Sequence, residues 1–71
     1  MNPEMIAELL SREYRSVRVV LKSGASYIEI NRMALLSTRE AEHLANRETS
    51  LEGIIADRWR SPNAFYPVFS Q

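Results

Sequence analysis

Few side chains in this sequence could take part directly in catalysis. There is one histidine, His43, and one aspartate, Asp57, with no cysteine and only two glycines. A Ser–His–acid set could in principle use His43, but a chain this short leaves little room for an enclosing pocket. His43 also lies among charged residues on a predicted helix, which favours a solvated side chain. We therefore expect a protein that is not an enzyme and that has no catalytic residue.

The sequence also contains few residues that could bind a metal ion or a cofactor. A zinc site needs several histidine, cysteine or carboxylate ligands, and His43 has no cysteine or second histidine to join it. The two glycines are too far apart to form a phosphate-binding loop. We expect no cofactor and no metal ion, so function is expected to depend on contacts with another molecule.

The formal net charge is zero, but the charges are unevenly spread. Residues 12–32 hold five basic and two acidic side chains, a balance of +3, whereas residues 33–59 hold three basic and five acidic ones, a balance of −2. A dedicated nucleic-acid-binding domain usually has a stronger basic bias. A protein partner is therefore favoured over direct binding to nucleic acid.

The length of 71 residues predicts a single domain, 1–71, with a small core. Without disulfides, a homodimer or a complex with a partner remains a possible source of added stability. No apolar run approaches the roughly 18–20 residues that span a bilayer. The N-terminus lacks the basic start and apolar stretch of a secretory signal. We therefore expect no membrane association and a cytoplasmic location.

The N-terminal half predicts a helix followed by a β-hairpin. Asn2 and Pro3 are typical of a helix start, and apolar residues at helical spacing extend the prediction over about 3–13. Two alternating β-branched runs then flank Ser23-Gly24, the predicted hairpin turn. With these two as the loop, Val19 faces Ile28 and Val17 faces Ile30, while Arg18 faces Glu29 and Val20 faces Tyr27. A turn at Gly24-Ala25 would keep the same faces with shifted partners.

The C-terminal half predicts two short helices and a tail. Ser37-x-x-Glu40 and Thr49-x-x-Glu52 are both capping boxes, the first with Leu36 and Ala41 placed as a hydrophobic staple. The first helix is expected to end near Asn46, and Ser61-Pro62 ends the second. The second helix has an apolar face of Leu51, Ile54, Ile55 and Trp59. The fold class is thus α+β: a folded body, 1–60, of helix, hairpin and two helices, followed by an aromatic tail, 61–71.

The two short helices, 37–59, have the outline of a degenerate helix-turn-helix. The stretch LLSTREAEHLANRETSLEGIIADRWRS resembles the first helices of excisionase and MerR-type winged-helix proteins. This resemblance implies a small DNA-binding regulator that uses Arg47, Arg58 and Arg60. However, the usual turn glycine is missing, and the second helix presents Glu48, Glu52 and Asp57, which would repel phosphates.

Two surfaces are candidates for binding a protein. The second hairpin face combines Arg18, Val20, Lys22 and Tyr27, a mixture typical of interfaces; the alternative is a solvated face that includes one tyrosine. The tail, with Phe65 and Phe69, either anchors a partner or folds back to complete the core. Deleting a folded-back tail would cost several kcal/mol of stability, whereas deleting an anchor would abolish binding and leave the domain folded.

The whole chain resembles small regulators encoded by lytic phages. The stretch NPEMIAELLSREYRS and the hairpin at 17–30 are similar to the RNA polymerase-binding regulator of Xanthomonas phages. This resemblance implies a transcription regulator that binds host RNA polymerase, inhibits initiation and promotes antitermination. It assigns no individual residue. A phage head–tail joining protein shares only the order of elements.

Overall fold

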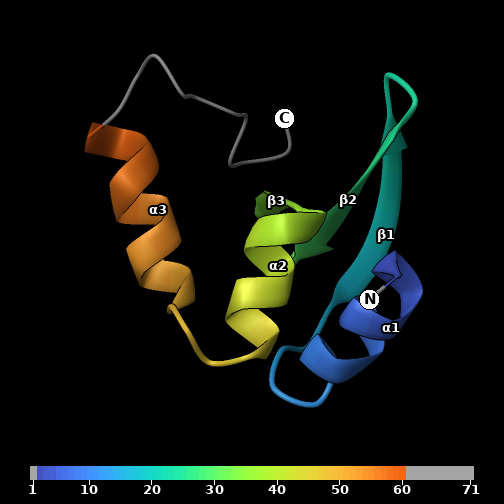
Figure 1. Ribbon diagram of the computed structural model, residues 1–71, viewed down its shortest axis with the longest axis horizontal. Coiled ribbons are helices and arrows are strands. Elements are labelled where there is room, and N and C mark those ends of the chain that lie inside the picture. The colour runs from blue at the N-terminus through green and yellow to red at the C-terminus, as the bar shows by residue number, and fades with distance from the viewer. Residues whose placement is uncertain (1, 61–71) are drawn as a thin grey trace.

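A computed structural model describes residues 2–60; the predicted tail, with Phe65 and Phe69, lies outside the described residues. Its elements follow the expected order of helix, hairpin and two helices, with one additional strand (Figure 1). They are α1 (Pro3–Leu10), β1 (Val17–Lys22), β2 (Ala25–Ile30), β3 (Ala34–Ser37), α2 (Thr38–Ala45) and α3 (Leu51–Arg60). The α+β class is thus confirmed.

Helix α1 begins as the sequence predicts and ends earlier. The Asn2 side chain accepts a hydrogen bond from the backbone N–H of Met5 at 2.9 Å, so Asn2 is the N-cap. The helix ends at Leu10, three residues before the expected end at residue 13. The Ser11 hydroxyl donates to the Ala7 carbonyl at 2.7 Å, and residues 11–13 form turns after the helix. These turns keep helix-like spacing, which explains why the sequence pattern predicts a longer helix.

The hairpin has the predicted register. Val17 pairs with Ile30, Val19 with Ile28 and Val20 with Tyr27, and the turn consists of Ser23 and Gly24. Ser23 has φ of 53° and Gly24 of 79°. A type I′ turn requires positive φ at both central residues, and its twist matches that of the strands. The alternative turn at Gly24-Ala25 is thereby excluded.

Strand β3 was not predicted. It pairs antiparallel with β2, placing Leu36 beside Ile28 and Ala34 beside Ile30, so the sheet order is β1-β2-β3. The connecting turn brings the Met33 N–H to the Ile30 carbonyl at 3.0 Å. Its residues Ala-Leu-Leu-Ser contain no β-branched apolar side chain and run directly into a helix cap. Short apolar segments of this kind carry little periodic signal.

Helices α2 and α3 have different kinds of cap. Ser37 and Glu40 form the predicted capping box, with reciprocal bonds of 3.0 and 3.1 Å, and α2 ends at the expected C-cap, Asn46. In α3, by contrast, the Ser50 hydroxyl accepts the Gly53 N–H at 3.0 Å. The predicted cap at Thr49 is therefore wrong by one residue. Ser50 caps α3 because its carbonyl already accepts the Ile54 N–H at 3.0 Å.

The hydrophobic core lies between one face of the sheet and the helices. Figure 1 shows α1 and α2 on the same side of the sheet. The fully buried large side chains are Ile6, Leu10, Ile28, Ile30 and Leu36. On α3, Ile54 is buried and Leu51 and Ile55 pack partly against the core. The expected apolar face of α3 is wrong at its last position, because Trp59 is 72% exposed. None of the helices within residues 2–60 has the length and apolar character needed to cross a membrane.

Candidate protein-binding surface

The second face of the hairpin gathers the residues that the sequence nominates for binding. Val17, Val19, Ile28 and Ile30 point toward the core, so the alternate positions lie on the opposite side of the sheet. These alternate positions are Arg18, Val20, Lys22 and Tyr27, which we call the hairpin face. The strand register places Val20 directly beside Tyr27, and both are half-buried. Arg18 and Lys22 are exposed on either side of them along β1.

Arg18 is oriented by its cross-strand neighbour. Its Nε–H donates to the Glu29 carboxylate at 2.7 Å, and the Glu29 side chain is only 7% exposed. This hydrogen bond and the negative charge of Glu29 raise the pKa of Arg18 above its ordinary value. The Arg18 side chain is nevertheless 70% exposed. Its guanidinium is thus held over the sheet with surface still accessible to a partner.

The accessible part of this side of the sheet is its hairpin half. Glu29 and Leu35 point to the same side as Arg18, but both are buried. Residues 21–25, in contrast, are all exposed. Figure 1 shows the tip of the hairpin extending beyond the helices. Leu21, on the side that faces the core, is consequently 71% exposed. The hairpin is therefore accessible at its tip from both sides.

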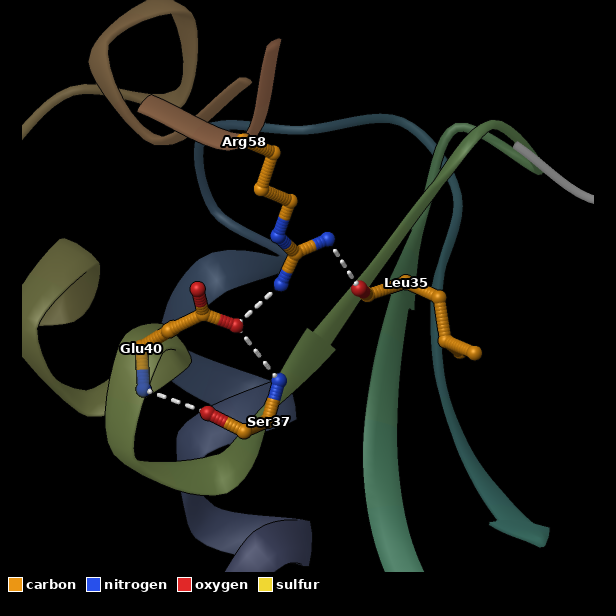
Figure 2. A network of polar contacts seen from close by, with 4 residues as sticks. All are labelled: Leu35, Ser37, Glu40 and Arg58. Carbon is orange, nitrogen blue, oxygen red and sulfur yellow. Dashed lines mark hydrogen bonds and ion pairs between the residues drawn. The ribbon is translucent and has the colours of Figure 1, made fainter. Parts of the chain in front are cut away.

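A buried arginine attaches α3 to the rest of the fold (Figure 2). Arg58 is 5% exposed, and its Nη1 donates to the Leu35 carbonyl on β3 at 2.7 Å. Its Nη2 donates to the Glu40 carboxylate, which also accepts the Ser37 N–H of the α2 capping box. One guanidinium therefore connects α3 to β3 and α2. Sequence reasoning missed this role, since neither the buried position of Arg58 nor the existence of β3 was predicted.

The arginines of the helix-turn-helix hypothesis do not form one exposed group. Arg58 is internal, which corrects its use as a surface contact. Arg47 is 81% exposed and pairs with Glu13 at 3.0 Å, and Arg60 pairs with Asp57 at 3.2 Å. Each of the three therefore already contacts a carboxylate of the same chain.

His43 has a local partner at the surface. Its Nδ1 lies 2.5 Å from the Glu48 carboxylate, and both side chains are about half exposed. Within residues 2–60 there is no group of three histidine, cysteine or acidic side chains that could hold a metal ion.

The sequence and the fold were compared with known proteins. No family model matches the sequence. No curated protein and no solved structure matches the chain either.

Proposed function

We propose that this protein is a non-enzymatic binding domain that attaches to another protein through the hairpin face. The observation that carries this proposal is the grouping of Arg18, Val20, Lys22 and Tyr27 on the side of the sheet opposite to the helices α1 and α2. Aromatic and arginine side chains are enriched in interface cores and in their energetic hot spots. A half-buried Tyr27 beside Val20 supplies an apolar centre, and Arg18 and Lys22 supply a charged rim.

Host RNA polymerase is the partner we propose. The resemblance of the N-terminal stretch and hairpin to the polymerase-binding regulator of Xanthomonas phages supports this choice. The protein would then be phage-encoded, act in the host cytoplasm, and inhibit initiation or promote antitermination. A net charge of zero suits attachment to a protein, because no large electrostatic attraction to DNA is required.

The DNA-binding alternative has weaker support from the same residues. A recognition helix approaches phosphates most easily when its surface is basic. Helix α3 instead exposes Glu52 and Asp57, and its Arg58 is internal. The remaining arginines of that hypothesis are engaged in ion pairs.

Affinity capture from host-cell lysate, followed by mass spectrometry, tests the proposal. Recovery of the polymerase subunits at stoichiometric levels is the expected result. A parallel titration of duplex DNA with salt separates the alternative, since phosphate contacts give a log–log slope of roughly −0.9 per contact. Steeply salt-dependent binding to DNA, with no polymerase captured, would overturn the proposal.

A further inference from the structure

An open hollow lies at the end of the hairpin away from its tip. The chain enters β1 and leaves β2 here, since Val17 pairs with Ile30. The hollow has a volume of about 500 Å³, and we call it the arginine hollow. It is lined by Glu13, Tyr14, Arg15, Ser16, Asn31 and Arg32. A second hollow of about 400 Å³ shares Ser16 and Arg32 with it and is also lined by Arg18 and Glu29.

The backbone around the arginine hollow is tied together. The Asn31 N–H donates to the Ser16 carbonyl at 2.6 Å, joining the segment before β1 to the turn after β2. Asn31 and Arg32 have φ of 56° and 57°, in the left-handed region that an arginine rarely adopts. Because the Met33 N–H also donates to the Ile30 carbonyl, these two are the central residues of a type I′ turn that joins β2 to β3. Both walls of the hollow therefore hold a defined position relative to each other.

The charges of the arginine hollow are only partly balanced. Glu13 pairs with Arg47 at 3.0 Å, and Glu29, next to the hollow, pairs with Arg18 at 2.7 Å. Within residues 2–60, neither Arg15 nor Arg32 has an ion-pair partner. Both are exposed. Two arginine residues therefore line one hollow without an ion-pair partner among the residues that the structure describes.

Tyr14, which lines the arginine hollow, has an uncharged hydroxyl group. Burial, together with the negative charges of Glu13 and Glu52, raises the pKa of Tyr14 above its ordinary value. The phenol therefore stays protonated at neutral pH. A protonated phenol can donate a hydrogen bond to an anion.

We infer that the arginine hollow binds carboxylate side chains of an acidic segment in the protein partner, an inference that rests on the proposed function. The planar guanidinium presents paired N–H donors that match the two oxygens of a carboxylate. Arg15 and Arg32 supply two such groups, and Arg32 also lines the second hollow, which includes Arg18 of the hairpin face. One partner could therefore cover both surfaces.

A nucleic acid fits this surface less well than an acidic peptide. Duplex DNA carries one negative charge per about 1.7 Å of its axis, so phosphates would extend well beyond two arginines. The neighbourhood includes Glu13 and Glu52, whose charges act on Tyr14. A short acidic segment can direct one or two carboxylates to the arginines and avoid these residues.

Titration of the isotope-labelled full chain with hexaglutamate, followed by amide NMR, tests the inference. Shift changes should concentrate in residues 13–16 and 31–32. The double substitution Arg15→Gln and Arg32→Gln should weaken binding about fivefold or more, because two exposed charge contacts are lost. A matched variant, Arg12→Gln with Arg39→Gln, removes the same charge from exposed residues outside the hollow and should bind as the parent does.

Three outcomes would overturn the inference: no shift changes at millimolar peptide, equal weakening in the matched variant, or tighter binding of a DNA duplex at the same residues. Circular dichroism of both variants verifies that they are folded. The polymerase-capture experiment is independent of the peptide titration. Polymerase capture without peptide binding removes this inference alone, whereas peptide binding at the hollow without polymerase capture removes the proposed partner alone.

Discussion

At the residue scale, the Arg58 side chain connects α3 to both β3 and α2. It lies next to Trp59 on α3, yet the tryptophan is exposed and the arginine is buried. A helical pattern read from the sequence favours the opposite arrangement, since tryptophan is apolar and arginine is charged. Arg58 can be buried because a carbonyl of β3 and the carboxylate of Glu40 both accept its hydrogen bonds. The first of these acceptors belongs to β3, a strand that the sequence pattern did not predict.

Replacing Arg58 with methionine is expected to destabilise the protein strongly. The substitution removes the hydrogen bond to the Leu35 carbonyl and leaves Glu40 with only the Ser37 N–H, and we expect a loss of about 2–3 kcal/mol in the free energy of unfolding. Urea denaturation measures the loss. Arg60→Met is the matched control, because its exposed ion pair with Asp57 contributes no more than about 0.5 kcal/mol. Equal losses in the two variants would contradict the assigned role of Arg58.

At the element scale, helices, turns and strands with a strong local sequence pattern were predicted correctly, whereas those that depend on tertiary contacts were not. The hairpin register was predictable because alternation and the Ser23-Gly24 turn agree with each other. The α2 capping box was predictable because it depends only on Ser37 and Glu40. At α3, however, Thr49 and Ser50 are adjacent residues that can both serve as caps, and the choice depends on how the helix packs. Strand β3 depends on pairing with β2, a tertiary contact.

The cap of α3 can be tested by paired substitutions. Ser50→Ala removes the hydroxyl that accepts the Gly53 N–H and should cost about 1 kcal/mol of stability. Thr49→Ala should change stability by less than about 0.5 kcal/mol, as is usual for exposed surface positions. Thermal melting followed by circular dichroism compares them. A larger loss in Thr49→Ala than in Ser50→Ala would restore Thr49 as the cap.

The hairpin turn offers a stabilising change. Ser23 has positive φ, a conformation that asparagine tolerates better than serine, and Asn-Gly is the favoured type I′ pair. Ser23→Asn is therefore expected to raise stability by a few tenths of a kcal/mol. Gly24→Ala should instead lower stability by about 1 kcal/mol, because φ of 79° is unfavourable for a residue with a side chain. Crowding is not the cause, since no neighbouring atom lies within 4 Å of the position that the new Cβ would take. Urea midpoints that move in the opposite directions would contradict this turn geometry.

At the scale of the whole molecule, the two sides of the sheet differ in what they contact. The helices α1 and α2 lie on one side and form the core with it, and the tip of the hairpin extends past them (Figure 1). On the other side, Arg18 and Lys22 are exposed. The hairpin face was predictable because alternation alone assigns residues to a side of a sheet. The arginine hollow was not predictable, because Arg15 and Arg32 line one hollow only when the two ends of the hairpin are brought together.

The most direct test of attachment through the hairpin face is the affinity of a double variant, Val20→Ala with Tyr27→Ala, for purified host RNA polymerase. We expect at least about tenfold weaker binding, since central apolar and aromatic contacts dominate interface energetics. A control with Met5→Ala and Met33→Ala, which truncates exposed apolar residues elsewhere, should bind as the parent does. Unchanged affinity of a folded Val20/Tyr27 variant would contradict the assignment of the hairpin face as the binding surface.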